Sequence, residues 1–280
     1  MSKCHLIIDV ERCMDCNNCF LACKDEFVEN EWKGYSAAQP RHGQRWVNIL
    51  RKERGRFPLI DVAYLPVPCM HCADAPCVRK AGEGEVYRRE DGIVIIDPEK
   101  AVGKKDLVKA CPYGAIWWNE ERNAPQKCTL CAHLLDKGWE RPRCVQACPS
   151  GAMRFVRAED PEMGRVIEDE QLEVLHPEYR TNPSVYYRNL HRYFKCFVAG
   201  SIAFKKNGLV DCAAGATVVL KKGGREIREA VTDAFGDFKL DGLDERSGAY
   251  TLEILYGGHE NVTLEIDLKE STSLPAILIP

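Results

Sequence analysis

The chain has 280 residues, of which 45% are hydrophobic and 29% charged, and its formal net charge is −3. These values are typical of a globular protein of one or two domains, and the lack of a basic surplus argues against nucleic-acid binding. No apolar run approaches the ~18 residues of a membrane helix, and the N-terminal apolar stretch is shorter than that of a signal peptide. We therefore expect a cytoplasmic protein with no direct membrane insertion.

The 15 cysteines are too many to be incidental, and most of them fall in clustered runs. A disulfide scaffold would be the rival use of so many cysteines in an exported protein. Because the chain is large and the cysteines are clustered, we interpret them as reduced thiolates in a reducing compartment.

Residues 5–10 predict a short buried strand that leads into the first run. Cys13, Cys16, Cys19 and Cys23 form the C-x₂-C-x₂-C-x₃-C spacing that holds [4Fe–4S] clusters. A structural zinc site is the alternative, but zinc sites use paired C-x₂₋₄-C knuckles rather than four cysteines within eleven residues. Residues 20–27 predict a short helix.

Residues 24–68 form an insertion in which 47–50 could be a strand, and the basic stretch 51–56 is expected to be a solvated turn. The second run, Cys69, Cys72 and Cys77, is a C-x₂-C-x₄-C variant of the first. Ala81 stands where its fourth cysteine should be.

Residues 93–112 repeat the opening of the chain, because Ile95-Ile96-Asp97 lines up with Ile7-Ile8-Asp9. In this register Ala101, Lys104 and Leu107 replace the three loop cysteines, and only Cys111 remains. The fourth run is aligned with the second and consists of Cys128, Cys131, Cys144 and Cys148.

In two-cluster ferredoxins the last cysteine of each run ligates the other cluster. If the first run pairs with the fourth and the second with the third, three complete [4Fe–4S] sites result, with no cysteine of the runs left over. We name them as follows: the first set is Cys13, Cys16, Cys19 and Cys148; the second set is Cys128, Cys131, Cys144 and Cys23; the third set is Cys69, Cys72, Cys77 and Cys111.

The missing fourth site would need positions 101, 104, 107 and 81, and all four are non-ligands. A random loss of four cysteines would leave half-built sites, so the loss of one whole site favours the nested pairing. Twelve thiolates around three clusters with cores of about +2 would bring the net charge to about −9. Cys4, Cys196 and Cys212 lie outside the pattern and are expected to be small buried apolar residues.

The C-terminal part begins with an acidic, helix-like stretch at 158–176 and a connector at 183–197. After that the apolar period changes to two, as in Val262, Leu264, Ile266 and Leu268, and Gly223-Gly224 lies between two strand-like runs as a hairpin turn. About seven short strands over some 80 residues predict a β-sandwich. Residues 232–238, followed by 248–250, resemble transthyretin-like domains.

The predicted fold class is therefore α+β, with nested bacterial ferredoxin-like modules followed by an all-β transthyretin-like or Ig-like sandwich. We expect a ferredoxin-like domain over residues 1–195 and the sandwich over 196–280. No catalytic constellation is visible in either part. We therefore expect a non-catalytic subunit.

The order of the four runs resembles the iron–sulfur subunits of molybdopterin oxidoreductases of the dimethyl sulfoxide reductase family. The lost site, the sandwich and motifs such as Gln44-Arg45-Trp46-Val47-Asn48-Ile49 and Gln126-Lys127-Cys128 make the chain similar to the small subunits of aromatic transhydroxylases of this family. The resemblance implies a large catalytic partner that holds a molybdenum or tungsten bis-pterin guanine dinucleotide. It also implies a reaction on polyhydroxylated aromatics, of the pyrogallol to phloroglucinol type.

Two other functions stay open. The chain could serve another molybdopterin enzyme, such as a resorcinol hydroxylase, a catechol dehydroxylase or a membrane-attached respiratory reductase. It could also be a stand-alone polyferredoxin, although a mobile carrier has no need of an 80-residue sandwich. In the resembling family the cluster of the missing site lies farthest from the pterin, so we expect the electron path to stop short of a membrane partner.

Overall fold

The computed structural model describes residues 2–280 and divides into two compact units. The first unit comprises the chain up to Arg51 together with Tyr64–Leu190, and the second comprises Lys52–Ala63 with His191–Pro280. From the sequence we expected the boundary at residue 195 and the whole of 24–68 in the first domain. In the structure the second unit includes Lys52–Ala63, which is the tip of a hairpin within that insertion.

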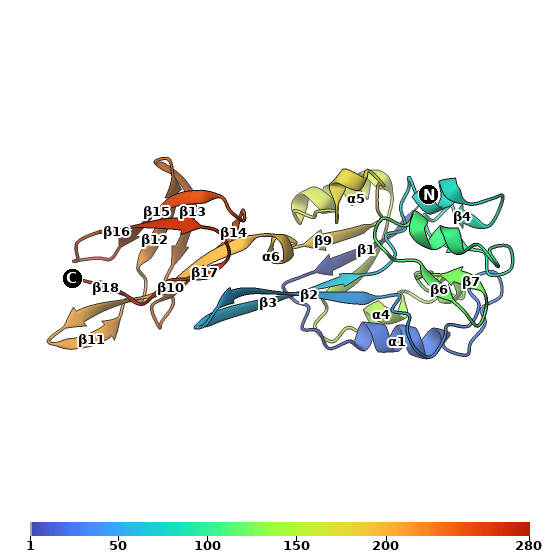
Figure 1. The fold of residues 1–280 in the computed structure, drawn as a ribbon, viewed down its shortest axis with the longest axis horizontal. Coiled ribbons are helices and arrows are strands. Elements are labelled where there is room, and N and C mark those ends of the chain that lie inside the picture. Colours follow the sequence, from blue (N-terminus) through green and yellow to red (C-terminus); the bar gives the residue numbers. More distant parts are fainter. Residues whose placement is uncertain (1) are drawn as a thin grey trace. The chain divides into compact units, whose positions relative to one another are not determined.

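The first unit contains a three-stranded sheet, part of which is visible in Figure 1. Strand β1 (Lys3–Asp9) lies between β8 (Met153–Ala158), which is antiparallel to it, and β9 (Val185–Arg188), which is parallel. The five inner residues of β1 are buried. A central strand that is covered on both faces explains why its apolar residues follow one another without alternation. The predicted strand over 5–10 is thus confirmed, and it begins two residues earlier.

The cysteine loops of the first unit are supported by short helices and two small hairpins. Helix α1 (Asn18–Phe27) begins after Asn17, which adopts a left-handed conformation, and packs beside α4 (Figure 1). The expected helix over 20–27 is confirmed and begins earlier. The other elements are α2 (Pro76–Lys80), β4 (Val86–Arg88), β5 (Val94–Ile96), η1 (Lys105–Ala110), β6 (Trp117–Asn119), β7 (Ala124–Gln126), α3 (Ala132–Leu135), α4 (Arg143–Gln146), α5 (Asp160–Asp169) and η2 (Pro177–Tyr179).

Strands β2 (Asn48–Arg56) and β3 (Leu59–Val67) form the hairpin of the insertion. The expectation that 51–56 is a solvated turn is wrong, because these residues continue β2 and the Arg54 side chain is buried. The Arg54 guanidinium forms ion pairs with two carboxylates of the second unit, Asp61 and Asp241. Burial of an arginine is tolerated where such partners desolvate together with it.

Two sheets enclose one hydrophobic core in the second unit. The first sheet contains β11 (Leu209–Cys212), β10 (Cys196–Lys206) and β14 (Asp237–Leu243), and both β17 (Thr272–Ser273) and β18 (Ile277–Ile279) also pair with β10. The second sheet has the order β13 (Arg225–Val231), β12 (Thr217–Lys222), β15 (Gly248–Leu255), β16 (Val262–Leu268). Short α6 (His191–Phe194) precedes β10.

The local predictions for this part are confirmed at two places. Strand β16 coincides with the alternating apolar positions Val262, Leu264, Ile266 and Leu268, and Gly223 and Gly224, both with positive φ, join β12 to β13. Gly236 is required at its position because a Cβ atom there would lie 2.2 Å from the Ile202 carbonyl oxygen. The transthyretin-like topology itself stays a prediction.

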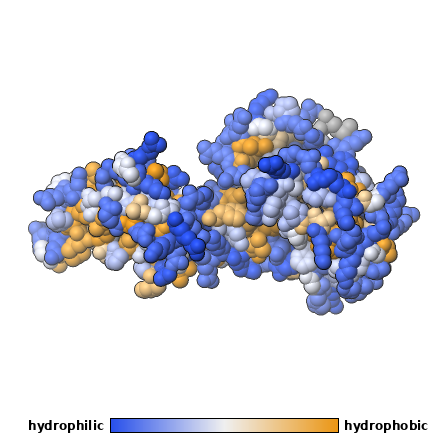
Figure 2. Space-filling model, turned by 45° about the horizontal axis from the view of Figure 1, so that its top comes forward, coloured by the Kyte–Doolittle hydropathy of each residue, from blue (hydrophilic) through white to orange (hydrophobic). Residues whose placement is uncertain are grey.

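The surfaces of both units are mainly hydrophilic, with separate apolar areas in the view of Figure 2. Among residues 2–280, no helix combines the length and the apolar character needed to cross a bilayer. Of the three cysteines outside the runs, Cys4 and Cys196 are buried as expected, whereas Cys212 is exposed at the end of the edge strand β11. The expectation of burial was therefore wrong for Cys212.

Candidate iron–sulfur sites

The loop between β1 and α1 carries Cys13 and Cys16 of the first set, and the first turn of α1 carries Cys19. Asp15 and Asn17 both have positive φ, which turns the chain tightly enough for successive cysteines to face one side. Burial, together with the neighbouring thiols of Cys13, Cys148 and Cys16, raises the pKa of Cys19 to about 12. The structure thus brings the four residues of the first set together. Cys16 is exposed and Cys19 buried.

The second set lies deeper. Burial raises the pKa of Cys23 well above its ordinary value, and the charges of Cys128, Cys131 and Cys144 act in the same direction. All four residues are buried. Cys23 comes from α1 and Cys144 from α4, so the side-by-side packing of these helices joins cysteines that are far apart in sequence.

The third set lines a single cavity, where Cys69, Cys72, Cys77 and Cys111 meet. Burial raises the pKa of Cys72 to about 12, and the nearby Cys69, Cys111 and Cys77 thiols contribute to the increase. Cys111 is partly exposed, whereas the other three are buried. Residues from two different runs are again brought to one place.

The three sets form a series. Cys144 of the second set lies close enough to Cys19 of the first for the charge of one thiol to raise the pKa of the other. Cys128 of the second set stands in the same relation to Cys69 of the third. The order along the unit is therefore first, second, third, with the most exposed cysteines at the first set.

The donors fit [4Fe–4S] clusters chemically. The raised pKa values of buried thiols such as Cys19, Cys23 and Cys72 mean that these three would be neutral without a compensating cation. Metal coordination deprotonates such thiols outright. Backbone N–H groups of Leu130 and Ala115 donate to the Sγ atoms of Cys128 and Cys111 at 3.3 and 3.4 Å. Hydrogen bonds of this kind to ligand sulfurs tune cluster potentials.

The spacing of the cysteines in the three sets differs from that of ligands around a single metal ion. Among residues 2–280, no three His, Cys, Asp or Glu side chains converge as they would around one metal ion. Ligands of one zinc ion each lie about 2.3 Å from it when they are thiolates. A cubane spaces its four thiolates more widely, because four iron atoms lie between them.

Sequence reasoning missed Lys127. Its side chain is fully buried, and its ammonium donates to the carbonyl oxygens of Val94 and Cys128. No carboxylate pairs with it among the described residues. Its charge instead lowers the pKa of Cys77, Cys111 and Cys128, which places it between the second and third sets. A buried cation without an acidic partner next to cysteines is the signal that could have identified it.

The position of the lost fourth site is filled by protein. Ala101 and Leu107 are fully buried, and the Lys104 ammonium lies 2.7 Å from the Glu85 carboxylate with its side chain 47% exposed. Leu107 occupies part of the interior while Lys104 carries its charge to the surface, as long basic side chains do. Ala81 ends α2 beside this region.

The chain is similar to known iron–sulfur proteins. A family model described as a 4Fe-4S dicluster domain matches residues 60–158. The pyrogallol hydroxytransferase small subunit of Pelobacter acidigallici is 52% identical over 91% of this chain and 91% of its own length. A sulfite dehydrogenase subunit of Allochromatium vinosum is 33% identical over 67% of this chain and 83% of its own.

Among solved structures, the Klebsiella pneumoniae 5-hydroxyisourate hydrolase covers 30% of this chain and 84% of its own, at 19% identity and a TM-score of 0.24, which is too low to support an argument.

The 52% identity to the pyrogallol hydroxytransferase small subunit, over 91% of both chains, shows the family of this chain. The chain belongs to the family of electron-transferring iron–sulfur subunits of molybdopterin oxidoreductases, within which it is similar to the small subunit of pyrogallol hydroxytransferase.

Proposed function

We propose that the chain carries three [4Fe–4S] clusters on the first, second and third sets, and that it serves a large catalytic subunit holding a molybdenum or tungsten bis-pterin guanine dinucleotide. The grouping of twelve cysteines into three sets of four is the observation that supports this most strongly. Clusters held in this way accept and release single electrons. The chain itself supplies their ligands, their spacing and their shielding from water.

The first set is the proposed end nearest to the catalytic subunit. Its cysteines are the most exposed, and Met14 and Leu21 beside it are 58% and 56% exposed. A groove of about 880 Å³ runs along α1, lined by Phe20, Leu21 and Val28 together with basic residues. Exposed apolar side chains next to an electron-transfer group fit a protein interface better than a free surface.

The second unit is proposed to brace this assembly. It contains none of the twelve cysteines of the three sets, and it exposes large apolar side chains at two hairpin tips, Phe57 at 89% and Leu209 at 74%. Tips of this kind would be suitable anchors on a large partner. Removal of the sandwich would then weaken the complex but leave the cluster content unchanged.

The proposed reaction of the complex is hydroxyl transfer between polyhydroxylated aromatic rings, by likeness to the relative whose name states hydroxytransferase activity on pyrogallol. Such a transfer returns its own electrons, so it needs no quinone-linked partner. The filled fourth site suits this reaction, because it ends the series at the third set. A respiratory reductase would instead need a path onward.

Iron and acid-labile sulfide assays on the purified complex test the cluster number. About twelve of each per chain are expected from three cubanes. A reproducible value near sixteen would refute the proposal. Copurification with a pterin-containing subunit would separate it from a stand-alone polyferredoxin, which would purify alone.

Reoxidation tests the reaction class. The complex is reduced chemically and then mixed with a quinone analogue. Slow reoxidation, together with full hydroxyl transfer in the absence of an external donor or acceptor, is expected. Rapid reoxidation coupled to turnover would show a respiratory role instead.

A further inference from the structure

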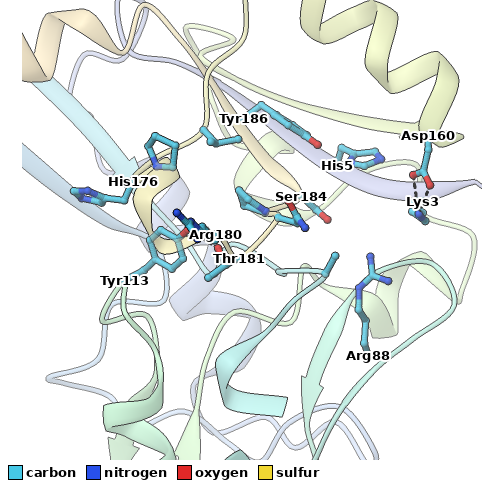
Figure 3. Close-up of a pocket in the computed structure, with 15 residues that line it drawn as sticks. Lys3, His5, Arg88, Tyr113, Asp160, His176, Arg180, Thr181, Ser184 and Tyr186 are labelled. Atoms are coloured by element: carbon cyan, nitrogen blue, oxygen red, sulfur yellow. Dashed lines mark hydrogen bonds and ion pairs between the residues drawn. The ribbon is translucent and has the colours of Figure 1, made fainter. Parts of the chain in front are cut away.

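A cavity of about 610 Å³ lies in the first unit at the edge of β9 and η2 (Figure 3). None of its lining residues is a cluster ligand, and the proposed electron transfer does not use it. Pockets of this size with a few convergent polar groups are the usual form of small-molecule sites. Its position, its charge and its connection to the third set together suggest a ligand.

The wall of the cavity is fixed to the cysteine loop that carries the third set. The backbone N–H groups of Ala73 and Asp74, directly after Cys72, donate to the carbonyl oxygens of Asn182 and Thr181 at 2.8 and 3.1 Å. Ser184 Oγ donates to the His71 carbonyl oxygen at 3.1 Å. Bonds on both sides of Cys72 hold the wall in place, so the cavity is built before any ligand enters.

The cavity has a surplus of positive charge in an acidic protein. Lys3 and Asp160 neutralise each other at its edge, with 2.7 Å between Nζ and Oδ1, and Asp160 is the only carboxylate of the lining. Arg88 and Arg180 remain, and within residues 2–280 neither forms an ion pair with a carboxylate. Figure 3 shows Arg88 extending from β4 toward the cavity, while Arg180 lies beside Thr181 and Tyr113.

The other lining groups suit an anion with a planar body. Tyr113, His176 and Tyr186 contribute rings, and His5, which is 4% exposed, packs against Tyr186 with 5.9 Å between ring centroids. Arginine guanidinium groups bind carboxylates through paired N–H donors, and aromatic rings stack on flat molecules. A neutral or cationic ligand would leave the two guanidinium groups without a counter-charge.

A hydrogen-bonded path connects the cavity to the third set. The Tyr113 hydroxyl lies 2.7 Å from Thr181 Oγ1, and the Thr181 carbonyl oxygen accepts from the backbone N–H of Asp74, two residues after Cys72, at 3.1 Å. A ligand that competes for the Tyr113 hydroxyl would weaken this chain, and its negative charge would oppose reduction of a cluster nearby.

We propose that this cavity binds a small aromatic carboxylate between Arg88 and Arg180, and that its occupancy lowers the reduction potential of the cluster held by the third set. The proposal rests on the proposed three-cluster function. Because coupling between two sites is reciprocal, the anion binds more weakly when that cluster is reduced. The cavity would thus allow an anion to regulate electron storage at the end of the series.

Benzoate is the probe, and the holo complex with its catalytic subunit is the sample. Calorimetric titration is expected to show one benzoate site per chain that Arg88→Gln and Arg180→Gln each weaken about tenfold, the equivalent of about 1.4 kcal/mol for one charged contact. Benzyl alcohol, the neutral analogue, should bind at least about tenfold less tightly. Arg188→Gln is the matched control, because Arg188 is exposed on β9 outside the cavity. It should leave benzoate affinity unchanged.

The coupling is tested by redox titration of the third-set cluster with and without saturating benzoate. A threefold weaker affinity for the reduced protein corresponds to a potential lowered by about 28 mV, at 59 mV per tenfold for one electron. Tyr113→Phe should keep benzoate affinity within about threefold and reduce this shift. A purely structural tyrosine would affect neither the shift nor its dependence on benzoate.

Two results would overturn the inference. One is the absence of a benzoate site that depends on Arg88, whether no benzoate binds or all variants bind it equally. The other is a site that binds phosphate and benzoate alike and leaves the potential unchanged, which would mean an adventitious ion only. Iron content is measured on every sample, so loss of the clusters, which would contradict the proposed function, is distinguished from an empty cavity.

Discussion

Arg54 offers a sharp test of which unit the hairpin tip belongs to. Its side chain is 1% exposed, and its two terminal nitrogens bind Asp241 in a bidentate manner, each at 2.9 Å. It also pairs with Asp61 and donates to the Lys195 carbonyl oxygen at 3.0 Å. Replacing it by Met removes the cation and leaves the two acidic partners partly buried.

The loss of stability caused by Arg54→Met depends on the cations that remain near the two carboxylates. Breaking a buried ion pair typically costs about 3–5 kcal/mol, because the partner charge stays desolvated. Asp61 would still have Lys239 at 2.7 Å and Arg192 at 2.6 Å, so the lower end is expected, about 3 kcal/mol. For a unit of about 100 residues this lowers the midpoint of thermal unfolding by roughly 12 °C or more.

Calorimetry of the holo protein, with the visible absorbance of the clusters recorded in parallel, is the assay. The transition of the second unit should move, while the cluster absorbance stays unchanged until the first unit unfolds. Arg56→Met is the control, because Arg56 lies on the same strand as Arg54 and pairs with Glu270 at the surface. The two side chains are 77% and 58% exposed, so this pair should contribute less than about 1 kcal/mol. Equal effects of the two substitutions, or cluster loss with Arg54→Met alone, would refute the reasoning.

The remaining predictions concern acid, charge and packing. The surrounding cations hold the pKa values of Asp61 and Asp241 below their usual range. The contribution of these carboxylates to the stability of the second unit is therefore complete above about pH 4, the pKa of an unfolded Asp, and is lost as the pH falls through the folded pKa values. In acid unfolding, the stability of Asp241→Asn should fall less steeply with decreasing pH. Lys127→Met removes a charge that acts on cysteines of the second and third sets. For a separation of roughly 7 Å and an effective dielectric constant of about 20, this charge is worth about 2.4 kcal/mol, or about 100 mV for one electron. Redox titration should show both potentials lowered, and unchanged potentials would contradict the placement of Lys127. Leu107→Ala should destabilise the first unit by about 2–5 kcal/mol in urea unfolding, because Leu107 is 1% exposed at the position of the missing fourth site. A loss below about 1 kcal/mol would mean that Leu107 does not fill the interior at that position.

For the cysteine runs, the sequence by itself predicts both the local loop geometry and the proposed pairing. The spacing of Cys13, Cys16 and Cys19 determines a tight loop by itself, and the repeat between 7–13 and 95–101 shows which positions were lost. Ligand exchange between runs then leaves only a few pairings. The alternation in 262–268 likewise determines its strand, because side chains in a strand point to opposite faces in turn.

Only the tertiary structure decided the features that depend on distant residues. Arg54 meets Asp241 across 187 positions, so no local pattern distinguishes this buried arginine from the exposed Arg51 or Arg56 of the same basic stretch. In the sequence alone, Lys127 does not differ from a surface lysine. The fold buries it near Cys77, Cys111 and Cys128. Burial and charge compensation are properties of the whole fold, whereas loop geometry and strand alternation are encoded by neighbouring residues.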